Sequence, residues 1–179
     1  AGGFWGRGSW VGLSGNFGSV ALGRNYPAYD SLRGATNNTA DTNMSVTGDV
    51  WTAGSTYKAD GSIDKSTDYS NRVNNSIRFD SNVYSGFSGA VSYAFGEDKA
   101  AGLDSTDNLS LHIKYANGPV LVGYGHQTQK AATGADTKYN LIAGSYDFGV
   151  AKLSAGYNTG KRAASEDKEY QVGVSAPFG

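Results

Sequence analysis

The sequence has no cysteine, and this absence excludes a disulfide framework and any metal site built on thiolates. It also has only three prolines and two histidines among its 179 residues. Two histidines without cysteine argue against a zinc site, and no Gly-rich phosphate-binding motif opens a helix. We therefore expect a protein that works without a metal or other cofactor.

The sequence also lacks an excess of charge of either sign. Fifteen basic residues stand against 16 acidic ones, for a formal net charge of −1, which argues against a nucleic-acid partner. No apolar run approaches the roughly 18 residues that a transmembrane helix needs. That absence does not exclude a membrane barrel, because its strands alternate between apolar and polar residues and give a weaker signal.

Glycine and tyrosine are abundant instead, at 26 and 12 residues, which favours strands and turns over helices. Apolar and small or polar side chains alternate in nine segments, each near the 9–11 residues of a tilted bilayer-spanning strand. The segments cover about 5–14, 18–26, 72–81, 87–95, 107–116, 120–128, 137–146, 150–159 and 168–176. The alternation is less regular in two of them, because Leu121 and Ile142 are apolar but fall at the alternate positions that the other residues make the polar face.

The connections between these segments alternate in length. Short turns at 15–17, 82–86, 117–119 and 147–149 alternate with long connections at 27–71, 96–107, 129–136 and 160–167. This order predicts an up-and-down meander with all of its long loops on one rim, as in outer-membrane barrels. The connection at 27–71 is far longer than an ordinary loop, and we expect it to lie without regular structure inside a closed sheet.

The alternation alone does not say which face of the sheet meets water. A soluble all-β binding module would turn the apolar face inward. Aromatic residues near the strand ends, and an opposite face rich in Ser, Gly, Asn and Ala, favour an apolar exterior in a membrane. A membrane-barrel enzyme is the other alternative, but Ser110 and His112, although on one face, lack a nucleophile motif. We expect an all-β antiparallel transmembrane barrel that is not an enzyme.

Two stretches carry a resemblance to a known family. Residues 10–26, WVGLSGNFGSVALGRNY, and residues 72–81, RVNNSIRFDS, resemble the Gram-negative general porins, nearest to their beta-proteobacterial type. The chain departs from the family at Asn82, where a proline is usual. The resemblance covers essentially the whole chain. It implies a sixteen-stranded outer-membrane barrel, normally a homotrimer surrounded by lipid, that passes small hydrophilic solutes and ions by diffusion.

The resemblance also assigns parts to the segments of the chain. Residues 1–179 would be a partial barrel domain holding about the fourth to the twelfth family strand. About three strands would be missing before Phe4 and about four after Phe178. Residues 27–71 would be the external loop that folds into the lumen and forms its constriction.

The alternation along the strands and the family resemblance together indicate which charged residues line the constriction. Arg7, by resemblance, and Arg78, by parity, would form a basic cluster facing Asp30, Asp41 and Asp49 of the inserted loop, with Arg33 among those acids. We further expect Arg72, Asp80, Lys114 and Lys152 on the pore wall. The alternative is that each arginine is a wall residue paired with a carboxylate such as Asp80. Because the strongly acidic loop motif of the family is absent after Pro27, we expect a weak anion preference.

Overall fold

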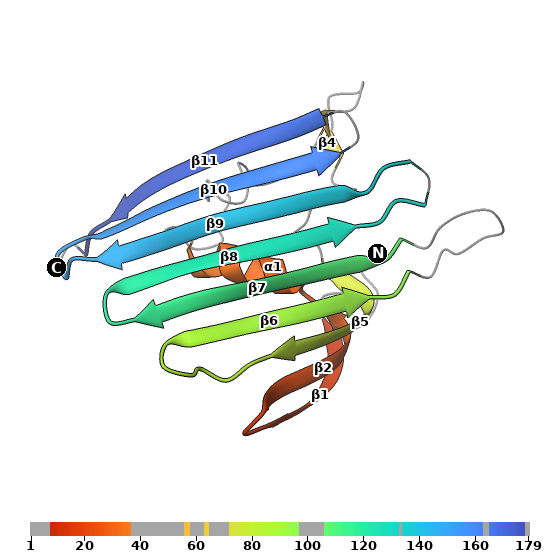
Figure 1. The fold of residues 1–179 in the computed structure, drawn as a ribbon, viewed down its shortest axis with the longest axis horizontal. Coiled ribbons are helices and arrows are strands. Elements are labelled where there is room, and N and C mark those ends of the chain that lie inside the picture. The colour runs from red at the N-terminus through yellow and green to blue at the C-terminus, as the bar shows by residue number, and fades with distance from the viewer. Residues whose placement is uncertain are drawn as a thin grey trace.

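A computed structural model describes residues 8–36, 56–57, 63–64, 72–96, 106–132, 134–162 and 165–177. In these residues one nine-stranded sheet runs antiparallel throughout, and its strand order follows the chain (Figure 1). Its strands are β1 (Ser9–Gly15), β2 (Gly18–Asn25), β5 (Val73–Asp80), β6 (Phe87–Ala94), β7 (Asn108–Asn117), β8 (Val120–Gln129), β9 (Thr137–Asp147), β10 (Lys152–Arg162) and β11 (Ser165–Ser175). Two short strands, β3 (Thr56–Tyr57) and β4 (Ile63–Asp64), pair separately.

The nine strands confirm the nine segments expected from alternation, with ends shifted by a few residues. The short turns also lie where the sequence places them, and glycines at positive φ make two of them possible. Gly118 has φ 54° between β7 and β8, and Gly149 has φ 83° between β9 and β10. Residues with a side chain rarely adopt a positive φ, so glycine at these two points allows the tight hairpin turns.

The segment after β2 corrects one expectation. We expected 27–71 to lack regular structure, but it opens with the helix α1 (Ala28–Ala35). Pro27 precedes the helix with φ −58°, an angle compatible with a helical start. Asp30 in the first turn and Arg33 in the last turn suit the helix dipole. The Thr36 hydroxyl closes the far end by donating to the carbonyls of Leu32 and Arg33, both at 3.2 Å.

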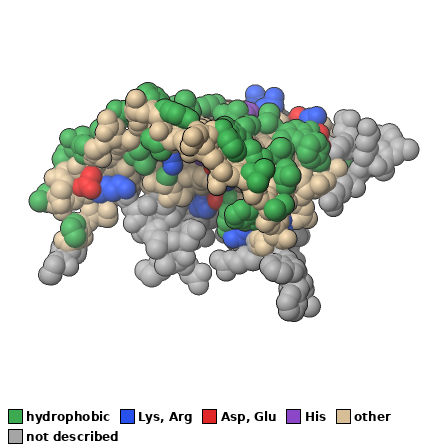
Figure 2. All heavy atoms as spheres, turned by 90° about the horizontal axis from the view of Figure 1, so that it is seen from below, with side chains coloured by type: hydrophobic (Ala, Val, Ile, Leu, Met, Phe, Trp, Pro, Cys, Tyr) green, Lys and Arg blue, Asp and Glu red, His purple; other side chains and the backbone are tan. Residues whose placement is uncertain are grey.

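The two faces of the sheet differ in chemistry. The sheet is bent into an arch, and hydrophobic side chains spread over its convex surface (Figure 2). Pairs of aromatic rings lie near strand ends on this face, with centroid distances of 4.8 Å for Phe87 and Tyr115 and 4.9 Å for Tyr93 and Phe95. In the described part of the chain, no helix is long and apolar enough to cross a bilayer.

The concave face is mainly polar, except beneath α1. Register partners along one row of this face are Arg78, Ser92, Ser110, Gln127 and Tyr139. The buried apolar cluster lies between the helix and this face, and it consists of Tyr29, Leu32, Tyr139, Leu141 and Ala143.

This cluster explains the irregular register of β9. Ile142 shares its parity with Lys138 and Asn140, so the alternation placed it on the polar, inward face. That assignment is wrong, because Ile142 is the register partner of Tyr124 and Tyr157 on the convex face. Three successive inward residues of β9, Tyr139, Leu141 and Ala143, are apolar because they belong to the cluster beneath α1. Leu121 does lie on the concave side, where it pairs with Ser145.

Candidate functional site

The helix α1 lies against the concave face and contacts β6, β7, β8 and β9 (Figure 1). Its position is set by contacts with residues far away in the sequence. Four kinds of contact hold it: hydrogen bonds to the first turn, an apolar contact over two glycines, a tyrosine hydroxyl bonded to β10, and an arginine clasp from β5.

The first turn of α1 is held by side chains from two strands. The backbone N–H of Ala28 donates to the Ser92 hydroxyl of β6 at 2.9 Å, and that of Tyr29 donates to the Ser110 hydroxyl of β7 at 2.7 Å. His112 Nδ1 lies 2.6 Å from the Ala28 carbonyl oxygen, and because a carbonyl only accepts, the imidazole donates here. The first N–H groups of a helix have no partner within it. We call Ser92, Ser110 and His112 the polar socket.

Two glycines of β8 make room for the helix. A Cβ at Gly123 would overlap Leu32 Cδ1, and a Cβ at Gly125 would lie 3.1 Å from Tyr29 Cδ2. Leu32 and Tyr29 are fully buried there. The absence of side chains at these two positions therefore lets the helix approach the sheet closely.

Tyr29 also anchors the helix to a more distant strand. Its hydroxyl donates to Asn158 Oδ1 of β10 at 2.5 Å, and Asn158 Nδ2 donates to Glu169 Oε2 of β11 at 2.8 Å. Burial raises the pKa of Tyr29 well above its ordinary value, and the nearby Glu169 charge acts in the same direction. The hydroxyl therefore keeps its proton at neutral pH and remains a donor.

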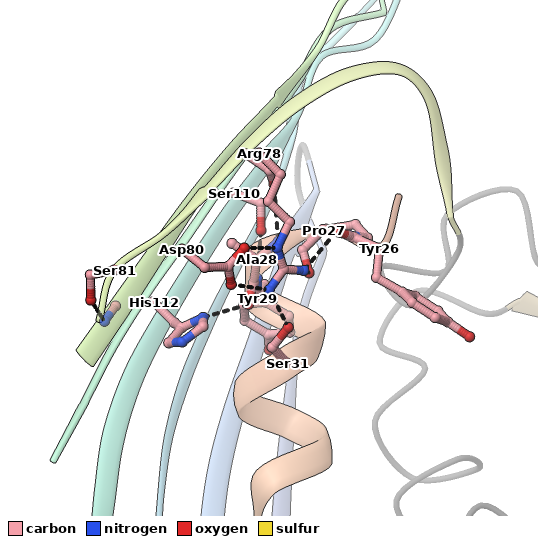
Figure 3. Close-up of polar contacts among 12 residues, drawn as sticks. Tyr26, Pro27, Ala28, Tyr29, Ser31, Arg78, Asp80, Ser81, Ser110 and His112 are labelled. Carbon is pink, nitrogen blue, oxygen red and sulfur yellow. Dashed lines mark hydrogen bonds and ion pairs between the residues drawn. The ribbon is translucent and has the colours of Figure 1, made fainter. Parts of the chain in front are cut away.

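Arg78 of β5 clasps the start of the helix from the side (Figure 3). Its guanidinium donates to Asp80 through Nε at 2.7 Å and through Nη2 at 2.6 Å. Nη1 donates to the Tyr26 carbonyl at 3.0 Å, and Nη2 also donates to the Ser31 hydroxyl at 2.7 Å. The Arg78 side chain is 14% exposed and that of Asp80 is 39% exposed. The planar fork thus joins the wall to the helix while a carboxylate balances its charge.

The other charged residues that the sequence singled out do not form one cluster with Arg78. Asp30 and Arg33 form a buried ion pair with each other at 2.8 Å. Lys114 and Lys152 lie on the concave face, as register partners of Gly123 and Asp147.

Arg72 does not follow the alternation. The register shifts between Gly23 and Asn25, and Asn75 adopts a positive φ of 52°, so the parity that links Arg72 to Arg78 is broken. The Arg72 guanidinium lies over the Tyr26 ring, 3.9 Å from its centroid. Arg7, Asp41 and Asp49 lie outside the described residues.

The sequence did not single out the polar socket, the two glycines of β8 or Asn158. In the sequence these residues are recognisable only as small or polar residues at alternate positions. Every strand of a water-facing wall shows the same alternation, so it does not distinguish them. The sequence placed Ser110 and His112 on one face correctly, but did not indicate that they hold α1.

The whole chain, residues 1–179, matches the Gram-negative porin family. The chain belongs to this family. Outer membrane porin protein 32 of Delftia acidovorans is 35% identical over 97% of the chain. Major outer membrane protein P.IB of Neisseria meningitidis is 29% identical over 80% of it. The solved anion-selective porin from Comamonas acidovorans is 32% identical and superposes over 96% of the chain with a TM-score of 0.76.

The chain spans about half the length of the relatives it matches, 50% of the Delftia porin and 52% of the Comamonas chain. Membership of the porin family confirms the resemblance and the all-β antiparallel fold class. It places the chain in the outer membrane of a Gram-negative bacterium. It also removes the two alternatives. A porin is not an enzyme, and it is a protein of the outer membrane, not a soluble binding module.

Proposed function

We propose that the chain is the wall and constriction of a water-filled channel through which small hydrophilic solutes and ions diffuse. One observation carries this proposal: α1 is fixed on the polar concave face of a sheet whose convex face is apolar. A helix held there by a polar socket and an arginine clasp occupies space that would otherwise be lumen. In this assignment residues 27–71 narrow the pore, and outer-membrane lipid covers the convex face.

Ion preference depends on charges that face the lumen. The concave face presents Lys114 and Lys152, while Asp80 balances Arg78 and Asp30 pairs with Arg33. Asp147, the register partner of Lys152, and Glu169, the register partner of Asn158, lie on the same face and offset the two lysines, so the preference depends on Arg7 and on the details of the constriction. We infer a weak anion preference, in line with the anion selectivity of the Comamonas porin. Arg7, Asp41 and Asp49 are proposed to complete the constriction, and Arg72 to lie near its rim.

Assembly is the second part of the proposal. Porin homologues form trimers and pass small solutes. The exposed apolar side chains of β1 and β2, among them Val11, Leu13 and Leu22, offer a surface for a neighbouring subunit or for lipid. We propose a homotrimer.

Deletion of the loop tests the channel proposal. Removing residues 36–68 from the full-length protein should raise the single-channel conductance and admit larger sugars, because the lumen loses the part of the inserted segment that follows α1. Shortening the connection at 97–105 is the matched control and should change neither value. Unchanged conductance and exclusion size after the first deletion would place residues 36–68 outside the lumen and leave no narrowing role for the segment beyond α1.

A further inference from the structure

The convex face changes character along β8 to β11. Near the short turns it is apolar, with Leu153, Val172 and Val174 exposed. Further from those turns one row of register partners consists of Tyr124, Ile142, Tyr157 and Tyr170. Tyrosines of this kind lie at the level of lipid headgroups, at the edge of the apolar band of a membrane barrel.

The next two rows beyond these tyrosines are polar and basic. One consists of His126, Asn140, Thr159 and Lys168, and the other of Thr128, Lys138, Lys161 and Glu166. Three lysines and one glutamate leave these rows with a formal charge of +2. All four charged side chains are exposed. We call Lys138, Lys161, Lys168, Asn140 and Thr159 the outward basic patch.

Two of these lysines are placed where repulsion opposes folding. Lys138 and Lys161 are direct register partners on the same face of β9 and β10. Cβ atoms of such partners are about 5 Å apart, and like charges in this arrangement destabilise a sheet. Lys168 is one strand further, and its Nζ lies 3.8 Å from Glu166 Oε2. An anion bound between Lys138 and Lys161 would convert this repulsion into attraction.

Below the lysines a hydrogen-bond network orders the polar groups. Asn140 Oδ1 accepts from the Tyr124 hydroxyl at 2.9 Å and from His126 Nδ1 at 2.8 Å. Its amide nitrogen donates to the Thr159 hydroxyl at 3.4 Å. The Thr159 hydroxyl thereby serves as an acceptor, and its own proton is available to an anion outside the network. Tyr124 and Asn140 thus join the tyrosine row to the lysine rows.

We propose that the outward basic patch binds the phosphate groups of an anionic lipid headgroup in the leaflet that surrounds the long-loop rim. The patch lies on the lipid side of the wall, directly beyond the tyrosine row, so a headgroup is the molecule that meets it. Ammonium groups and a hydroxyl donor match phosphate oxygens in charge and hydrogen-bonding character. This site is on the face opposite the pore and does not depend on what the channel conducts.

The test is lipid retention by the full-length porin in detergent, measured by native mass spectrometry. The probes are diphosphorylated lipid A and the same lipid with its phosphates removed. The variant Lys138→Gln/Lys161→Gln should bind the phosphorylated lipid at least about tenfold more weakly, since each lysine near an anionic lipid surface contributes about fivefold. Lys161→Gln alone should weaken binding about fivefold. The matched control, Lys114→Gln/Lys152→Gln, loses the same charge from the concave face and should bind like the wild type.

Three results would overturn the proposal. The first is unchanged retention of phosphorylated lipid by Lys138→Gln/Lys161→Gln. The second is equally tight binding of the lipid without phosphates, which would assign retention to the acyl chains. The third is complete displacement of the lipid by inorganic phosphate, which would make the patch a site for free anions.

Discussion

Arg78 and Asp80 lie two residues apart on β5 and share two hydrogen bonds, at 2.7 and 2.6 Å, while the same guanidinium holds Tyr26 and Ser31 at the start of α1. A residue expected to supply positive charge to the constriction thus also fastens the inserted segment to the wall. The two roles predict different effects of different substitutions.

Arg78→Lys separates the clasp from the charge. Lysine keeps the charge but lacks the planar fork, so it cannot bind Asp80, Tyr26 and Ser31 together. We expect both Arg78→Lys and Arg78→Ala to loosen the helix and lower stability by about 1.5–3 kcal/mol, the range for hydrogen bonds to charged groups. The measurements are the midpoint of heat unfolding in detergent and the open-channel noise of the full-length protein. If Arg78→Lys matched the wild type in both, the clasp would have no mechanical role.

Gly123→Ala should displace α1. The added methyl group would overlap Leu32 Cδ1, and because Leu32 is fully buried, either its side chain or the helix must shift away from β8. Overpacking of this kind costs about 1–3 kcal/mol. Gly34→Ala is the control, because a Cβ at Gly34 of α1 meets no atom within 4 Å. Gly123→Ala should lower the unfolding midpoint and change the conductance, whereas Gly34→Ala should leave the conductance unchanged and should not lower the midpoint, because alanine suits a helix better than glycine. A fall of equal size in both variants would count against the docking geometry.

Tyr29→Phe should weaken the anchor to β10. The substitution removes the donor to Asn158 Oδ1 and leaves a buried acceptor without that bond, at a cost of about 1–3 kcal/mol. Tyr157→Phe, on the convex face, is the control and should cost less. Equal unfolding midpoints for the two variants would show that the buried bond contributes nothing.

The same tyrosine predicts a pH dependence. Its pKa in the folded protein is raised above the ordinary value of 10.0, so folding favours the protonated form. Its contribution to stability is therefore complete below about pH 10 and falls as the pH rises beyond that value. Unfolding midpoints of wild type and Tyr29→Phe, measured from pH 7 to pH 11, should converge at the alkaline end. A constant difference over that range would contradict the assignment.

Lys114→Glu should shift ion selectivity toward cations. Two unit charges about 4 Å apart interact by about 4 kcal/mol at an effective dielectric near 20. Salt at 0.1 M screens over about 10 Å, so part of this energy acts across a narrow passage. The reversal potential in a KCl gradient reports the shift. Lys138→Glu makes the same charge change on the convex face and should leave the reversal potential unmoved; an equal shift in both would mean that the concave face is not the ion path.

The sheet could be predicted from the sequence because its two faces meet different media. Alternation and turn glycines such as Gly118 are local signals, and they located all nine strands. The polarity rule was wrong at Ile142, because the helix covers the inward side of β9 and makes that side apolar. The alternation also fails at Arg72, because the irregular backbone at Asn75 breaks it between Arg72 and Arg78.

The docking of α1 could not be predicted in the same way. The helix has eight residues in a polar stretch, too few for a clear period. Its contacts join residues far apart, and Tyr29 and Asn158 are separated by 129 positions. A serine that accepts a helix N–H is no different in sequence from a serine that faces water. The residues that hold the helix are therefore evident only in the folded chain.

Chemical labelling across one strand tests most directly which face of the wall is the lumen. Lys114 and Ile113 are neighbours on β7, one on the concave face and one exposed on the convex face. Each is changed to cysteine in a cysteine-free full-length protein, and a charged, membrane-impermeant thiol reagent is added during single-channel recording. We predict that Lys114→Cys reacts and changes its conductance in a step, while Ile113→Cys, covered by lipid, does not react. Reaction at Ile113→Cys with protection of Lys114→Cys would reverse the faces and contradict the channel.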